Sequence, residues 1–183
     1  YVPVRPTSSN SKHNANAVEQ TNGDLVGVSH LNALLTLLWP RVHHIIKLLT
    51  ANSHFAEFCG DNVPVLESLL STAGSICGVY KYLSADETDC RWLSGAAVLP
   101  LLVTGLSVYA KPTTVQYINT TSIPYSTSTV YIDCVSQILA VVRNFSVVKS
   151  CHKELVTQSV VPTLCALLGV YTAHSKVVVN CAR

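Results

Sequence analysis

Two pairs of adjacent side chains have the residue types that metal or nucleophilic chemistry needs. His43 and His44 carry imidazoles, but neighbours on a helix point about 100° apart and share a metal poorly. Cys151 and His152 supply a thiol and a base, although a catalytic Cys/His pair is normally assembled from distant parts of a chain. Neither pair therefore predicts a metal site or a catalytic centre.

Three carboxylates form an acidic cluster at Asp86, Glu87 and Asp89. Paired carboxylates perform acid/base catalysis in some enzymes. Acidic residues also favour the first turn of a helix, where they meet the positive end of the helix dipole. We expect that role, or a solvated loop, for this cluster. The chain also lacks the motifs of hydrolase elbows, zinc proteases, phosphate-binding loops and calcium loops, which predicts a non-enzymatic protein without a metal or cofactor.

The cysteines are odd in number, irregularly spaced and without a C-x-x-C pair. This arrangement indicates neither a disulfide framework nor a zinc ribbon. Most of them lie within apolar runs, where a free thiol packs like a small hydrophobic residue. We expect reduced core residues and therefore an intracellular, cytoplasmic protein. The seven are Cys59, Cys77, Cys90, Cys134, Cys151, Cys165 and Cys181.

The composition limits the class of protein. The 183-residue chain is 49% hydrophobic, only 12% of its residues are charged, and its formal net charge is +2. A soluble domain usually has about a quarter charged residues, so much of this surface must be covered. The length predicts one domain. The apolar content excludes disorder over most of the chain, and the near-neutral charge excludes a charge-driven nucleic-acid binder. Because the chain has no Met and stops just after the apolar run 177–179, we expect a fragment of a longer protein.

One uncharged stretch, residues 92–110, approaches the length that spans a bilayer. Arg91 and Lys111 bracket it, as charges bracket a membrane span. Pro100, Gly105 and several other small or polar residues divide it into two shorter pieces. We favour two buried helices joined by a turn, with a membrane span as the alternative.

The chain divides into a polar leader and a helical domain. Residues 1–23 are polar and lack the apolar core of a signal peptide, which predicts a disordered or linker arm. Residues 24–183 are expected to form one helical domain. Within it, helical spacing predicts one helix over 31–38 and another over 42–49, with Pro40 as the break between them.

An apolar-Pro-x-Leu pattern occurs three times, at Pro64, Pro100 and Pro162. Proline is tolerated in the first turn of a helix, because the amide that it lacks has no intrahelical partner there. Each pattern is therefore expected to begin the second helix of a helix–turn–helix unit. Pro64 and Pro100 are 36 residues apart, and Pro100 and Pro162 are 62 apart. These spacings fit a repeat of about 40 residues with one insertion of about 20.

The insertion is expected at about residues 111–128, which are rich in Thr, Ser, Tyr and Pro and lack a helical period. After it, helical spacing predicts a third helix over 130–146. Helices at 153–158 and 162–171 should follow, and a last one should begin near Ser175.

Three helices per unit, with Pro at the head of the second, resemble the armadillo repeat. The best match is the run 155–168, and residues 138–146 look like the end of the family's third helix, with Asn144 on its usual asparagine. The resemblance covers roughly residues 25–183. It implies an all-α fold, a right-handed α-solenoid of about three to four armadillo-like repeats, whose third helices line a concave groove.

The resemblance also implies where a partner protein would bind: Asn144, Arg143 and Asn180. The Asn144 amide either hydrogen-bonds a partner's backbone or pins the adjacent loop. Arg143 either pairs with an acidic partner or is solvated or internally paired. Asn180 belongs to the segment 175–183, which resembles the ciliary and flagellar branch of the family.

The leading hypothesis is a non-enzymatic protein–protein interaction scaffold in the cytoplasm, with a role in cilium or flagellum assembly. Two alternatives stay open. One is a membrane-associated helical protein that spans at 92–110, and the other is the docking region of a larger enzyme whose active site lies outside this chain.

Overall fold

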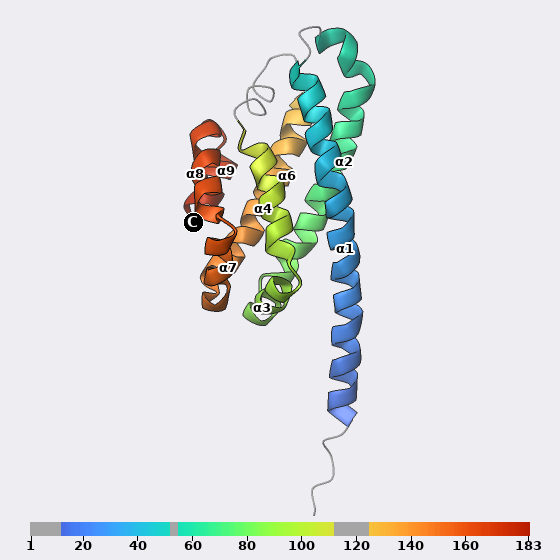
Figure 1. Ribbon diagram of the computed structural model, residues 1–183, viewed down its shortest axis with the longest axis vertical. Coiled ribbons are helices and arrows are strands. Elements are labelled where there is room, and N and C mark those ends of the chain that lie inside the picture. Colours follow the sequence, from blue (N-terminus) through green and yellow to red (C-terminus); the bar gives the residue numbers. More distant parts are fainter. Residues whose placement is uncertain (1–11, 52–54, 112–124) are drawn as a thin grey trace, which may run out of the picture.

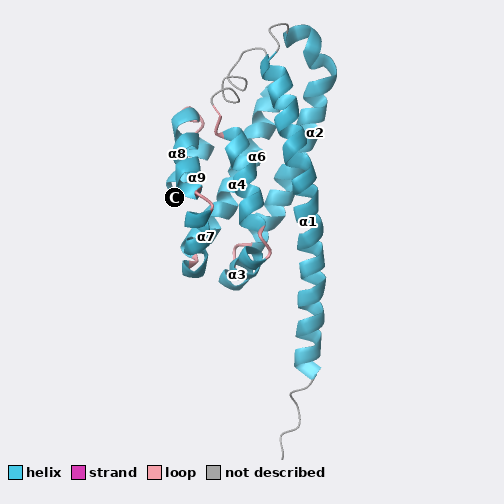
Figure 2. Ribbon diagram, viewed as in Figure 1, coloured by secondary structure: helices cyan, strands magenta, loops and turns pink. Residues whose placement is uncertain are grey.

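The computed structural model describes residues 12–51, 55–111 and 125–183, and gives side chains for 26–49, 62–111 and 128–183. All regular structure within these ranges is helical, which confirms the expected all-α class (Figure 2). The elements are α1 (Lys12–Ala51), α2 (Phe55–Leu83), α3 (Glu87–Gly95), α4 (Val98–Tyr109), α6 (Tyr125–Val147), the short 3₁₀ helix η1 (Lys149–Cys151), α7 (His152–Thr157), α8 (Val160–Val170) and α9 (Ser175–Ala182).

The longer helices pack in two rows. In one row α2 packs against α6, and α6 packs against α9; in the other, α1 packs against α4, and α4 packs against α8. Contacts between α1 and α2, α4 and α6, and α8 and α9 join the rows. Figure 1 shows α4 between α1 and α8, with α6 behind it. Each middle helix is therefore covered on two sides, whereas the outer helices are not.

The helix–turn–helix units expected at Pro100 and Pro162 are both present. The pairs α3–α4 and α7–α8 are each joined by a two-residue turn, and each proline is the third residue of the second helix. The last turn residues, Ala97 and Ser159, have left-handed φ angles of 57° and 54°. This conformation reverses the chain but costs a non-glycine residue about 1–2 kcal/mol. The helices expected at 130–146, 153–158, 162–171 and from Ser175 correspond to α6, α7, α8 and α9.

The expected breaks at Pro40 and Pro64 are wrong, because both prolines lie inside long helices, α1 and α2. An interior proline removes one backbone hydrogen bond and crowds the preceding turn, at a cost of about 3 kcal/mol. Around Pro40 the side chains of Leu38, Trp39 and Val42 are all buried, which holds both halves of the helix against the core. Burial of each contributes about 1.5–3 kcal/mol and offsets the proline.

Two predicted irregular segments differ from the structure. Of the arm expected at 1–23, residues 1–11 lie outside the described residues, and residues 12–23 form the first turns of α1. These turns extend beyond the other helices (Figure 1). Of the insertion expected at 111–128, residues 112–124 lie outside the described residues, and residues 125–128 belong to α6.

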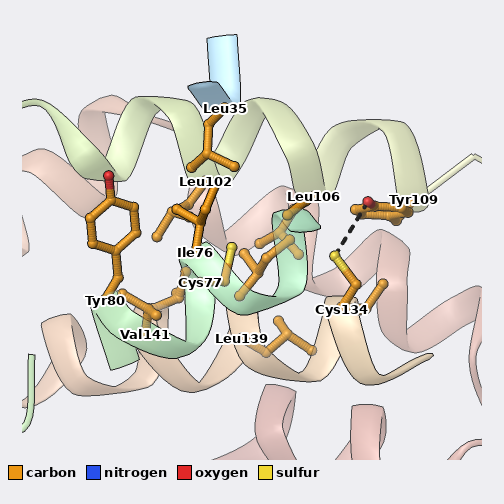
Figure 3. Close-up of a cluster of buried hydrophobic side chains, with 14 of the residues drawn as sticks. Leu35, Ile76, Cys77, Tyr80, Leu102, Leu106, Tyr109, Cys134, Leu139 and Val141 are labelled. Atoms are coloured by element: carbon orange, nitrogen blue, oxygen red, sulfur yellow. Dashed lines mark hydrogen bonds between the residues drawn. The ribbon is translucent and has the colours of Figure 1, made fainter. Parts of the chain in front are cut away.

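Buried side chains from both rows form one hydrophobic core. Figure 3 shows Leu102 of α4 near Ile76 and Cys77 of α2, and the Tyr109 hydroxyl directed at the Cys134 thiol of α6, 3.6 Å away. The rows thus meet in a continuous apolar layer that spans α1, α2, α4 and α6.

A polar link on α1 also ties the two rows together. The Tyr80 hydroxyl of α2 donates to Asn32 Oδ1 at 2.6 Å, and Asn32 Nδ2 donates to the Ala96 carbonyl at 2.9 Å. The Asn32 amide thereby satisfies a carbonyl that the turn after α3 leaves free, which fixes this turn against α1.

Candidate functional site

The side of α6 that faces away from the core is the middle of the α2–α6–α9 row. We call the residues at helical spacing on this side the α6 strip: Asp133, Ser136, Gln137, Ala140, Arg143 and Asn144. The opposite side of the helix carries the core residues Val135, Ile138 and Phe145, each 0% exposed. Because α2 and α9 flank α6, the strip is only partly open to solvent.

Two polar atoms of the α6 strip are buried without a hydrogen-bond partner in the described part of the chain. They are Ser136 Oγ and Gln137 Oε1. A buried polar atom without a partner costs about 1–3 kcal/mol, so it gains from a donor supplied by another molecule. Between them and Arg143 lies Ala140, which is only 5% exposed, so the middle of the strip is largely covered by its neighbours. Both residues as wholes are partly exposed, so a rotation of either side chain would turn its oxygen from the interior to the surface of the strip, where a bound chain could donate to it.

Asn144 does not point freely into the groove that the sequence predicts. Its Nδ2 donates to the Lys81 carbonyl at 3.2 Å and to Ser84 Oγ at 3.0 Å. Ser84 itself is only 2% exposed. Both donors of the amide thus tie α6 to the end of α2, which is the loop-pinning role left open as the alternative.

Arg143 and Asn180 lie on the two helices α6 and α9. Arg143 is half-buried on the α6 strip, and Asn180 Nδ2 donates to the Lys176 carbonyl of its own helix at 3.0 Å. An ion pair between Lys176 Nζ and Asp133 Oδ1, at 3.0 Å, joins the two helices. This pair is exposed, so it contributes little stability. It closes one end of the strip, beside a cleft of about 280 Å³ that His174 also lines.

A second cleft, between α1 and α4, was not foreseen from the sequence. It has a volume of about 420 Å³ and an apolar wall that includes Trp39, Leu101 and Val108. His43 and Lys111 form its polar end. The pKa of His43 is lowered, first by burial and then by the nearby Lys111 charge, so the imidazole stays neutral near pH 7. The cleft depends on the pairing of α1 with α4, which α2 and α3 separate in sequence, so no local pattern reveals it.

The adjacent residue pairs whose types could support metal binding or nucleophilic catalysis do not form reactive centres. Cys151 is buried, and its Sγ lies 3.9 Å from the Cys90 carbonyl, whereas His152 is exposed and its Nε2 lies 2.8 Å from the Ser146 carbonyl. Burial also raises the pKa of Cys151, which disfavours a thiolate. Among the residues with described side chains, no three His, Cys, Asp or Glu gather where they could hold a metal.

The acidic cluster serves helix α3. Asp86 Oδ1 accepts hydrogen bonds from the Thr88 and Asp89 amides, at 2.7 and 3.4 Å, and Glu87 pairs with Arg91 one turn later. These are the N-cap and first-turn roles expected from the sequence.

The described cysteines are free, and four of them are buried as expected: Cys77, Cys90, Cys134 and Cys151. Cys165 differs, because it is exposed on α8. Cys59 lies among the residues whose side chains are not described.

Two described helices are long and apolar enough to cross a membrane by length and composition, over Asn62–Leu83 and Ser128–Val147. Within the fold they are parts of α2 and α6, which pack against each other. The span considered from sequence, 92–110, corresponds to the pair α3–α4, which meets the same length and composition test only when the two helices are taken together and whose axes are bent by 81°.

Comparison with known protein families, with curated proteins and with solved structures finds no match to this chain.

Proposed function

We propose that this protein is a non-enzymatic protein–protein interaction scaffold, a right-handed armadillo-type solenoid that binds a partner polypeptide along the α6 strip. The partner lies across α2, α6 and α9, and its backbone N–H groups donate to polar atoms of α6. The observation that carries this proposal is that Ser136 Oγ and Gln137 Oε1 have no hydrogen-bond partner in the described part of the chain, and a rotation of their side chains would turn both oxygens toward the partner.

The two rows of helices support a solenoid. In such folds each unit contacts its neighbours and one kind of helix lines each side of the stack. The helices α2, α6 and α9 follow one another in one row, and each is preceded by a helix of the other row. The repeated pairs α3–α4 and α7–α8, each with a left-handed residue three positions before its proline, agree with a repeating unit.

Photo-crosslinking tests where the partner binds. A photoreactive phenylalanine analogue is placed at Arg143 or at Val147, which is 79% exposed at the end of α6. In lysate, both should crosslink to the same protein. The matched control carries the analogue at Arg91, an exposed residue on α3, and should give no such band. Equal crosslinking from all three positions would contradict the assignment of the partner to the α6 strip.

Gln137→Leu then tests the hydrogen-bonding role with the captured partner. The substitution removes the buried carbonyl that lacks a partner, so the free energy of unfolding should not fall. Affinity for the partner should drop by about threefold to tenfold, as expected for one lost hydrogen bond of about 0.5–1.5 kcal/mol. Unchanged affinity would refute the proposed contact.

A membrane-associated helical protein is the second candidate, because two helices satisfy the length and composition of a span. In the fold, 56% of the Ser128–Val147 window is already buried by protein. Flotation of the purified chain with lipid vesicles separates the two functions. Recovery with the vesicles favours the membrane role, whereas a helical protein that stays in the aqueous fraction without detergent favours the scaffold.

The location forms part of the same proposal: the cytoplasmic expectation rests on the cysteine pattern, and the ciliary expectation rests on the resemblance of segment 175–183. Imaging of the tagged protein in ciliated cells tests it, with enrichment at the cilium or its base as the expected result.

A further inference from the structure

The second helices of the two helix–turn–helix units, α4 and α8, differ sharply in burial. Leu99 of α4 and Val161 of α8 each directly precede the proline of their unit. Leu99 is 0% exposed, whereas Val161 is 64% exposed. Four residues further on, Val103 packs against the core, whereas Cys165 is exposed. Positions covered in the first unit are thus open in the second.

The position of α8 accounts for the burial of these residues in the first unit. Leu99 and Val103 lie on the side of α4 away from the α1 cleft, which Leu101 and Val108 line. Helix α8 packs against α4, and Figure 1 shows it on the side opposite α1. The same side of α8 carries the exposed Val161 and Cys165.

The opposite end of the rows is also apolar. On α1, Leu34 and Leu37 are 47% and 55% exposed and lie away from the side that packs on α4. On α2, Val65 and Val79 are 50% and 46% exposed and lie away from α6. These four residues form what we call the front face, and Val156, Val161 and Cys165 form the back face.

We propose that a second copy of this chain stacks on the first, with the back face of one copy against the front face of the next. Helix α8 of one copy then packs on α1 of the other, which continues the α1–α4–α8 row across the boundary. The contact is head-to-tail, so it leaves one free face at each end and allows longer stacks. Burial of exposed valine and leucine side chains drives the association.

This inference concerns the ends of the rows and does not depend on what the α6 strip binds. The evidence is continuity with the α4–α8 interface inside the chain, where the matching positions are already covered by a helix. Among the described residues nothing covers either apolar face, and exposed faces of this kind mark interaction sites.

Sedimentation of the full chain over a range of concentrations tests the proposal. The wild-type mass should rise with concentration beyond that of a dimer. Leu37→Glu blocks the front face and Val161→Glu blocks the back face, and each should raise the dissociation constant at least about tenfold, because a carboxylate would be buried. Both residues are exposed in one copy, so neither substitution should impair folding. Val147→Glu, on the α6 end, is the matched control and should assemble like the wild type.

Mixing the two variants makes the test decisive. Leu37→Glu keeps its back face and Val161→Glu keeps its front face, so an equimolar mixture should form a dimer and nothing larger. A face-to-face dimer would not be rescued by mixing. A wild-type chain that stays monomeric at every concentration would overturn the proposal and leave both faces to a different occupant. Assembly that persists in both variants would overturn it as well.

Discussion

Helices α4 and α8 begin alike, each with two apolar residues, a proline and a leucine two positions later, yet α4 is far more buried. Seven residues of α4 are buried, against Val160 and Leu167 in α8. Both helices are equally apolar, so composition does not decide their exposure. Position in the row decides it: among the described residues, α4 has a neighbour in its row on both sides, α1 and α8, whereas α8 has a neighbour in the row on one side, α4.

Truncating the equivalent side chains should show the largest difference between the two helices. Leu99→Ala removes a fully buried side chain and should lower the free energy of unfolding by about 2–5 kcal/mol. Val161→Ala, at the equivalent exposed position, should change it by about 0.5 kcal/mol or less. Urea unfolding of the monomer measures both, and equal losses would refute the contrast between a covered and an open helix.

Adding a methyl group should have opposite effects in the two helices. A Cβ at Gly105 of α4 would lie 2.9 Å from the Cε2 and Cζ2 atoms of the buried Trp39 ring, so Gly105→Ala should cost about 1–3 kcal/mol. A Cβ at Gly169 of α8 meets nothing within 4 Å, so Gly169→Ala should stabilise the helix by up to about 1 kcal/mol. Melting temperatures that move in the same direction for both variants would contradict the packing described for Trp39.

The thiols of the core and of α8 should differ in reactivity and in pH dependence. At about pH 8 a maleimide should modify exposed Cys165 in the native protein and leave Cys134 unmodified.

Burial raises the pKa of Cys134 to about 12 from its ordinary 9.0, so the folded state keeps a proton that the unfolded state releases. The contribution of the protonated Cys134 thiol to the free energy of unfolding is full below pH 9. It should be lost as pH rises towards 12, at about 1.4 kcal/mol per pH unit. Cys134→Ala should flatten the pH dependence of urea unfolding between those limits, and an unchanged slope would refute this role.

The two turns should respond alike, although the helices after them do not. Ala97 and Ser159 both hold a left-handed backbone that glycine adopts without strain. Ala97→Gly and Ser159→Gly should each stabilise the protein by up to about 1 kcal/mol, measured by thermal unfolding. A gain at one turn and a loss at the other would show that the turns are not equivalent.

Much of the helical order could be predicted from sequence because the signals were local. The segments on both sides of the turns before Pro100 and Pro162 have apolar residues at helical spacing, and the structure confirms the helices there. The break predicted at Pro40 is wrong, because a proline ends a helix by local preference and here tertiary packing outweighs that preference. The positions Leu35, Trp39, Val42 and Ile46 keep one helical register across it, which is the signal that favours a continuous helix.

The candidate site was harder to predict, because it depends on which helices become neighbours. The sequence singled out Asn144 for its place in a family pattern, but its amide is used between α6 and α2. Ser136 and Gln137 carry no local signal, since their lack of hydrogen-bond partners follows only from burial between α2 and α9. The α1–α4 cleft likewise depends on contacts between distant segments.

The aromatic rings at the centre of the molecule give the fold an optical signature. The Tyr109 ring centroid lies 6.2 Å from that of Trp39 and 4.8 Å from that of Tyr131, so the three rings connect α1, α4 and α6. The Tyr171 hydroxyl donates to the Tyr109 carbonyl at 3.1 Å, which adds the residue that follows α8. At these separations, we expect the excitation energy of Tyr109 to transfer to the Trp39 indole, which then fluoresces. Separation of α4 from α1 would restore tyrosine emission, so the spectrum reports the opening of the row without an added dye.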